Sequence, residues 1–464
     1  MLSLLFLNKI IETYSSCSMR HQDIKQTLID LPENAPEALV DSICSPTFLD
    51  LLGFSIQERV PQYSTGYGAQ KVDYALRRNT DGDIFIQTQA NPDILVELKG
   101  KDINLSESSA QYKSTVKQIK NYLLSPNCKS VRWGIITNSC HIQLFRKYGK
   151  VIHPATPCLE ITLDNVHEII REIKTKIERP PQALTVAVYN NKGGVGKTTT
   201  TLNLAATLTY LGKKVLVVDF DANQQDLTNS LKIKPAARTL YACLSDKTVD
   251  IRDVIQPYTV HNKTKNKERT FDIVPADDEL AVKGEDQLRQ LFDIKRLRKV
   301  LESIQSEYDY ILIDSPPNWR LFSQSAIYAA DVVLIPTKHN NVFSLDNAAL
   351  AICDFIPQIQ KERKDGGPIA LPIFFNGEKI TEAQRNTVNS TLIDIIKQTK
   401  KEYGFNLEPY FYPRCTKSKK NHYIFELPSY ANIANAAFSR TPAAYKDKTA
   451  HGYYKDLVKE YFLQ

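Results

Sequence analysis

A glycine-rich segment that directly follows an apolar run is the feature that most constrains this chain. The apolar run covers residues 185–189, and residues 192–199 then read K-G-G-V-G-K-T-T. Glycines let successive backbone N–H groups approach phosphate oxygens, and a helix that begins at Lys197 directs its positive end at the same anion. Lys197 can neutralise the β- and γ-phosphates of a nucleotide, and the Thr198 hydroxyl can bind Mg²⁺. The segment therefore predicts a strand, a phosphate-binding loop and a helix, in that order.

Apolar runs alternate with helix-length segments through the rest of the second half. They lie at 215–218, 271–274, 310–313, 332–335 and 369–375. Continuous apolar runs indicate strands that are buried on both faces, and their alternation with helices indicates a doubly wound, mostly parallel α/β sheet. Upstream, runs at 131–137 and 142–145 accompany a helical segment over 108–124, which predicts a smaller α/β unit. Two prolines at 180 and 181 end a charged helical stretch, so we expect domains at 1–178 and 184–464.

Composition and charge exclude several classes of protein. The chain has 464 residues and a net charge of +7, which is compatible with a polyanionic partner but does not by itself indicate one. Its eight cysteines form no C-x-x-C pair, so neither a zinc knuckle nor a disulfide framework is indicated. The apolar run at residues 1–7 is too short to span a bilayer, and we expect a cytoplasmic protein with no membrane partner.

Further motifs follow the glycine-rich segment in order. Asp219 and Asp221 end the run at 215–221, and Asp314 ends Y-I-L-I-D before Ser-Pro-Pro. Pro-Arg at 413–414 and E-L-P-S at 426–429 come later. With the glycine-rich segment, these motifs resemble the ParA/MinD family of deviant P-loop ATPases, from about residue 184 to the C-terminus. One departure is Asn191, which stands where the strict phosphate-loop pattern has its first glycine.

The resemblance implies a role for each matching residue. Lys192 would reach across an ATP-sandwiched homodimer to the partner's phosphates, Asp221 would position or activate the attacking water, and Asp219 would support the site. Asp314 would hold Mg²⁺ together with Thr198, and Asn376 would contact adenine. The residues implied to bind ATP are Gly193, Gly194, Val195, Gly196, Lys197, Thr198, Thr199 and Asn376.

The same resemblance implies slow ATP hydrolysis that is controlled by dimerisation, with ATP and Mg²⁺ as cofactors. ParA-like members bind DNA without sequence preference, and a hydrolysis-stimulating protein partner is usual among them. The basic cluster Arg414, Lys417, Lys419 and Lys420 is suited to phosphate contacts. MinD-like membrane targeting is the rival, but the last helix, at 453–462, carries few positive charges and is expected to pack on its own domain.

The N-terminal half contains a second group of chemistry-bearing residues. Asp73 begins one predicted strand, and Glu97 and Lys99 end the next, which would bring two carboxylates and a lysine together. Two carboxylates can hold Mg²⁺, which polarises a phosphodiester, and the lysine can stabilise developing negative charge. The group resembles the PD-(D/E)XK nucleases, particularly the N-terminal domain of type I restriction endonuclease motor subunits. Supporting residues would be Gln118 and Tyr122 on one helical face, with Glu37 as the first-helix acid and Glu58 as its competitor.

Three functions are compatible with this pattern of a restriction-endonuclease-like domain followed by a P-loop ATPase domain. The first is a ParA-like ATPase that dimerises on ATP, binds DNA non-specifically and carries a nuclease-like unit. The second is an ATP-gated, Mg²⁺-dependent endonuclease in defence or mobile-element processing. The third is a DNA segregation or positioning protein whose N-terminal domain is an inactive adaptor.

Overall fold

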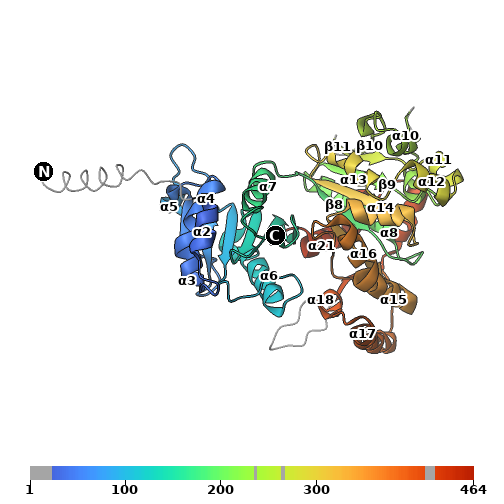
Figure 1. Cartoon of the computed structure of the whole chain (residues 1–464). Helices are drawn as coiled ribbons and strands as arrows, with labels where there is room; N and C mark the ends of the chain where they lie inside the picture. The colour runs from blue at the N-terminus through green and yellow to red at the C-terminus, as the bar shows by residue number, and fades with distance from the viewer. Residues whose placement is uncertain (1–22, 235–237, 263–266, 413–423) are drawn as a thin grey trace, which may run out of the picture. The chain divides into compact units, whose positions relative to one another are not determined.

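The computed structural model describes residues 23–234, 238–262, 267–412 and 424–464, and they divide into two compact units (Figure 1). The first unit comprises residues up to 147 and residues 155–179, and the second comprises residues 148–154 and 180–464. The short strand β6 (Val151–Pro154) thus falls within the second unit.

The first unit is an α/β layer around a mixed sheet in the order β1-β2-β3-β4-β5, with β7 beside β5. Only β3 and β4 in this order run parallel, and the crossover between them contains α6. Residues of α2, α4 and α7 share a hydrophobic core with alternate strand residues, while Ile119 and Leu123 of α6 lie against Gly134 of β4. The elements are α2 (Ile24–Asp30), α3 (Glu37–Leu39), α4 (Ser45–Leu51), β1 (Arg59–Ser64), β2 (Lys71–Leu76), α5 (Phe85–Thr88), β3 (Ile94–Leu98), α6 (Ala110–Leu123), β4 (Trp133–Thr137), β5 (His141–Tyr148), β7 (Leu159–Glu160) and α7 (Val166–Glu178).

The second unit is built on a doubly wound sheet in the order β10-β11-β9-β12-β8-β13-β15. All neighbours are parallel except the β10–β11 hairpin. Its strands are β8 (Leu184–Val188), β9 (Val215–Asp219), β10 (Gln256–Asn262), β11 (Lys267–Val274), β12 (Tyr310–Asp314), β13 (Val332–Leu334) and β15 (Ile369–Ala370). Strands alternate with helices as the sequence pattern predicts, which confirms the α/β class.

Alternate residues of each strand face different helices. Val215 and Val217 of β9 pack in a cluster with α8 (Lys197–Tyr210) and α21 (Lys448–Tyr461), whereas Leu216 and Val218 pack with α13 (Arg296–Glu302) and α14 (Leu321–Ala329). Because successive side chains in a strand point to opposite faces, the sheet is covered on both. The apolar residues of the last helix are buried in the first of these clusters, where Tyr454, Leu457 and Val458 are fully covered.

One predicted strand is two strands in the structure. Residues 369–375 divide into β15 and β16 (Phe374–Asn376), and β16 belongs to a separate three-stranded sheet in the order β14-β16-β17. Pro372 lies between them and has no N–H for a ladder hydrogen bond. The outer strands of this small sheet are β14 (Pro336–Thr337) and β17 (Phe425–Leu427).

The remaining α-helices of the second unit lie between these strands or follow the last of them. They are α9 (Asp226–Leu231), α10 (Leu240–Ser245), α11 (Asp278–Val282), α12 (Glu285–Leu291), α15 (Val342–Leu350), α16 (Ile356–Arg363), α17 (Glu382–Tyr403), α18 (Glu408–Phe411), α19 (Ala431–Ser439) and α20 (Ala443–Lys446). Within the described part of the chain, the continuous helical stretch 342–363 is the one segment whose length and apolar composition suffice to cross a membrane. Half of that window is buried inside the protein, as in an ordinary core helix, so this is weak support for a membrane span.

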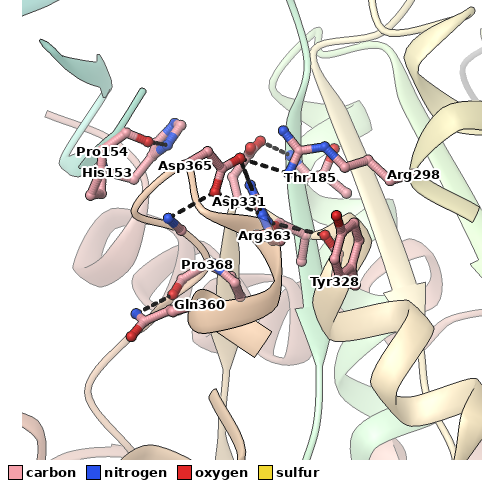
Figure 2. Close-up of polar contacts among 12 residues, drawn as sticks. His153, Pro154, Thr185, Arg298, Tyr328, Asp331, Gln360, Arg363, Asp365 and Pro368 are labelled. Atoms are coloured by element: carbon pink, nitrogen blue, oxygen red, sulfur yellow. Dashed lines mark hydrogen bonds and ion pairs between the residues drawn. The ribbon is translucent and has the colours of Figure 1, made fainter. Parts of the chain in front are cut away.

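An ion-pair network around the buried guanidinium of Arg363 lies at the edge of the main sheet where β8 and β13 begin (Figure 2). The Arg363 guanidinium pairs with Asp365 at 2.8 Å and donates to the Tyr328 carbonyl at 3.1 Å. Arg298 contacts the same carboxylate at 3.0 Å. Burial disfavours the charged form of Asp365, but the two guanidinium groups outweigh it and lower its pKa.

Candidate functional site

The glycine-rich loop joins β8 to α8, and α8 begins at Lys197 as the sequence predicts. Gly194 and Gly196 have φ angles of +76° and +88°, which side-chain-bearing residues rarely adopt. At Gly196 an added Cβ would also lie 2.1 Å from the Asn376 amide nitrogen. Gly193 and Gly194 are exposed, while Val195 is buried and anchors the loop to the unit. The loop is therefore shaped by backbone geometry that only glycine allows.

The lysine at the start of α8 folds back over the loop. Lys197 is 8% exposed, and its Nζ donates to the Lys192 carbonyl at 3.2 Å. Burial lowers the pKa of Lys197, and the charges of Asp314 and Asp221 oppose that effect. A buried ammonium group therefore lies close to two carboxylates at the point where the loop meets the helix.

The two strand-end acids come together because parallel strands end at the same edge of the sheet. Asp314 in β12 pairs in register with Val188 of β8 on one side and with Asp219 of β9 on the other. Asp314 is 1% exposed, and its Oδ1 has no hydrogen-bond partner among the residues that the structure describes. Burial, reinforced by Asp219, raises the pKa of Asp314 to about 8, although a hydrogen bond with Thr198 opposes the rise. A buried carboxylate with an unsatisfied oxygen beside a threonine hydroxyl fits the oxygen-donor set of Mg²⁺.

Asp219 and Asp221 have different surroundings. Asp219 accepts hydrogen bonds from the backbone N–H of Thr228 at 2.8 Å and from its hydroxyl at 2.6 Å, so its carboxylate holds the start of α9. Asp221 accepts bonds from the backbone N–H groups of Gln224, at 3.2 Å, and Asn223, and is 8% exposed. Burial raises the pKa of Asp221, while the backbone bonds and Lys197 lower it. Asp221 accepts fewer hydrogen bonds than Asp219, which also accepts the N–H of Asp221. No pattern in the sequence indicates the contact of Thr228 with Asp219.

Lys192 and Asn376 border the same loop. The Lys192 Nζ lies 5.9 Å from the centroid of the Phe343 ring, within the range of a cation–π contact, and Phe343 is 70% exposed. The Asn376 amide donates to the Val195 carbonyl at 2.9 Å. Asn376 therefore braces the loop from β16, a contact that the sequence did not indicate because the two residues are 181 positions apart.

In the first unit, the predicted acids and lysine meet at one point. The Lys99 Nζ lies 2.7 Å from Glu97 Oε1 and 3.3 Å from Glu37 Oε2. Asp73 lies beside them on β2, and its Oδ2 accepts the Leu98 N–H at 2.7 Å. Burial, reinforced by Asp73, raises the pKa of Glu97 to about 7, while Lys99 lowers it. The structure thus brings together Asp73, Glu97, Lys99 and Glu37.

Glu58, the alternative to Glu37, has a different place. Its carboxylate accepts the backbone N–H groups of Ser55 and Asn79, so it caps local structure. Glu97 is 2% exposed, and its Oε2 has no partner in the described part of the chain. Among the described residues, no three His, Cys, Asp or Glu side chains lie close enough together to hold a metal ion. A cation here would therefore rest on the two carboxylates of Asp73 and Glu97 and on further oxygen donors.

Two sets of predicted residues remain. On α6, the Gln118 amide donates to the Tyr122 hydroxyl at 2.8 Å, so the two residues share one helical face as their spacing predicts. The predicted DNA-binding residues Arg414, Lys417, Lys419 and Lys420 lie outside the described residues.

Comparison with known proteins identifies relatives of the second unit. A family model for an AAA domain (AAA_31) matches residues 183–366. The chain is 39% identical over 155 residues to the sporulation initiation inhibitor protein Soj of Bacillus subtilis (strain 168), covering 33% of this chain and 57% of that protein. It is 31% identical over 236 residues to the chromosome-partitioning ATPase Soj of Treponema pallidum (strain Nichols), covering 50% of this chain and 84% of that protein.

A solved structure of an ATP complex of McdA from Cyanothece aligns with 61% of this chain and 98% of that chain, with a TM-score of 0.46 and 20% identity. The chain spans little more than half the length of the Bacillus relative and most of the length of the Treponema relative.

Proposed function

We propose that this chain, which belongs to the ParA/Soj family, is an ATP-driven switch that dimerises on ATP and Mg²⁺ and then holds DNA. The observation that carries the proposal is the juxtaposition of the glycine loop, the buried Lys197 and the unsatisfied carboxylate oxygen of Asp314. A phosphate in the loop would accept a hydrogen bond from Lys197 Nζ, which otherwise donates to the Lys192 carbonyl. Mg²⁺ would bind the buried Asp314 Oδ1, which has no other partner among the described residues.

The residues around the loop have distinct tasks in this mechanism. The backbone N–H groups of 193–199 bind phosphate oxygens, and Lys197 neutralises their charge. Thr198 and Asp314 would hold Mg²⁺, which supplies charge neutralisation at the phosphates. Asp221 orients the attacking water, and Lys192 acts on the phosphates of a second copy. Asn376 keeps the loop closed against β16 and borders the adenine site. Because Lys192 reaches the phosphates of the second copy only when two copies dock, hydrolysis is slow. Hydrolysis in turn ends the dimer.

DNA retention and a nuclease-like first unit complete the proposal. The basic segment 414–420 contacts DNA phosphates without reading sequence, which makes the protein DNA-associated in the cytoplasm. A separate protein partner accelerates hydrolysis, as is usual for ParA-type switches.

A second candidate function is an ATP-gated endonuclease, and the convergence of Asp73, Glu97 and Lys99 favours it. Asp73 and Glu97 would hold Mg²⁺, which supplies a polarised phosphodiester and an activated water. Lys99 is already within 2.7 Å of Glu97, so its charge is placed to stabilise a developing phosphorane.

A plasmid assay tests both functions. Purified protein is incubated with supercoiled DNA, Mg²⁺ and ATP beside Lys197→Ala and Glu97→Ala variants, and DNA retention and nicking are both measured. We expect Lys197→Ala to abolish ATP-dependent retention and Glu97→Ala to abolish any nicking. Retention without nicking in the unaltered protein would leave the first unit as an adaptor. Retention and ATP turnover that persist in Lys197→Ala would refute the switch.

A further inference from the structure

Gln62 stands out in the first unit because its backbone is in the left-handed region. Its φ angle is +49° in the middle of β1, where an extended conformation is the norm. The residue is exposed, so burial of its side chain does not explain the conformation. Its amide donates to Asp73 Oδ1 at 3.2 Å. A glycine would adopt this φ without strain, whereas a glutamine adopts it at a cost.

The strand register shows what the unusual backbone does. Strands β1 and β2 pair Pro61 with Tyr74 and Tyr63 with Val72, and continuing this register would pair Gln62 with Asp73. That bridge is missing from an otherwise continuous ladder. The ladder between β2 and β3 likewise ends at Tyr74, next to Asp73. Asp73 therefore has no in-register partner in either ladder.

The side chain of Asp73 is hydrogen-bonded to both neighbouring strands. The Leu98 N–H bonds to Asp73 Oδ2 at 2.7 Å, and the Gln62 amide bonds to Oδ1. Each carboxylate oxygen has one donor, which fixes the plane of the group. An ionised carboxylate oxygen accepts more than one bond, so both oxygens keep capacity for a cation. Glu97 with its unsatisfied Oε2 and Lys99 approach from the adjacent strand.

We propose that Gln62 is a positioning residue that orients Asp73 for binding a divalent cation at the Asp73–Glu97 site. The inference rests on the proposed nuclease-like function. A backbone strain that coincides with one hydrogen bond to a metal-binding carboxylate is the kind of outlier that marks a functional site. Removal of a residue that hydrogen-bonds to a metal ligand typically weakens metal binding 10–100-fold.

The test measures metal binding by the full-length protein, in the absence of nucleotide. Mn²⁺ is titrated by electron paramagnetic resonance, and Glu97→Ala defines the binding that belongs to this site. Two variants remove the amide of Gln62: Gln62→Gly, which also removes the strain, and Gln62→Met, which retains the shape of the side chain. The control is Gln89→Gly, because Gln89 is also an exposed glutamine, with φ +50°, at the end of α5.

We expect both Gln62 variants to weaken Mn²⁺ binding at this site about tenfold or more. Gln62→Gly should unfold at the same temperature as the unaltered protein or higher, as should Gln89→Gly, which should also bind Mn²⁺ unchanged. A purely structural role would instead lower the unfolding temperature and leave the affinity alone. If Glu97→Ala removes Mn²⁺ binding but the Gln62 variants change it less than about twofold, the role of Gln62 is refuted and the site stands. If the unaltered protein shows no Mn²⁺ binding that depends on Glu97, both the metal site and the role of Gln62 are refuted.

Discussion

The buried Glu97 makes the stability of the first unit depend on pH, and the dependence can be worked out from its surroundings. Its pKa rises from the ordinary 4.5 to about 7 in the folded chain, chiefly through burial and secondly through Asp73. The folded state therefore binds the proton more tightly than the unfolded state. The resulting stabilisation is complete below about pH 4.5 and is lost as the pH rises through 7. At about 1.4 kcal/mol for each tenfold change in proton affinity, the total is roughly 3 kcal/mol, of which roughly 2.5 kcal/mol is lost between pH 5 and pH 8.

The substitution Glu97→Gln should remove this dependence, because the amide keeps the shape and cannot ionise. The assay is urea unfolding of both proteins at several pH values without divalent cations. The sequence has two tryptophans, and one lies in each unit: Trp133 is buried in β4, and Trp319 stacks on Phe355 with centroids 4.3 Å apart. In a Trp319→Phe background, fluorescence reports unfolding of the first unit alone.

The unaltered protein should lose roughly 2.5 kcal/mol of unfolding free energy between pH 5 and pH 8 relative to Glu97→Gln. Mn²⁺ at pH 8 should restore stability to the unaltered protein and not to the variant, because a cation stabilises the ionised carboxylate. Parallel pH profiles for the two proteins would refute the claim that Glu97 is protonated more tightly in the folded chain.

Three further changes test the second unit. Lys197→Ala should weaken binding of ATP about 10–100-fold in calorimetry, because it removes a charged hydrogen-bond donor, and unchanged affinity would contradict the site. Arg363→Ala should cost roughly 1–3 kcal/mol of unfolding free energy, because it removes the charged donor of the Tyr328 carbonyl and one of the two guanidinium groups that pair with Asp365, whereas Lys295→Ala breaks an exposed pair and should cost clearly less; equal losses in urea unfolding would count against the Arg363 network. Thr228→Val should cost about 1–3 kcal/mol, because the buried carboxylate of Asp219 loses its 2.6 Å hydroxyl bond; an unaltered unfolding transition would show that this bond is dispensable.

Much of this architecture could be predicted from the sequence because its signals are local. The strand before the glycine loop, the helix start at Lys197 and the acids at strand ends are read from contiguous residues, and parallel strands then bring Asp219 and Asp314 side by side. The same reasoning explains the approach of Asp73 to Glu97, since both lie on adjacent strands.

The rest depends on contacts between residues that are distant in the sequence or on backbone angles. The bond from Asn376 to the Val195 carbonyl and the bonds from Thr228 to Asp219 have no sequence pattern that announces them. The sequence also does not predict the left-handed backbone of Gln62, because glutamine has no preference for that conformation. The prediction of a single strand at 369–375 was wrong because Pro372 interrupts it and the chain continues into a second sheet.

Triphosphate bound in the glycine loop is proposed to make two copies of the chain dock. The most direct test is light scattering coupled to size-exclusion chromatography for an Asp221→Ala variant, with Mg²⁺ and either ATP or ADP. We predict a molar mass of one 52.7 kDa chain with ADP and twice that mass with ATP. A mass that stays at 52.7 kDa in saturating ATP, while ATP is shown to be bound, would contradict the account.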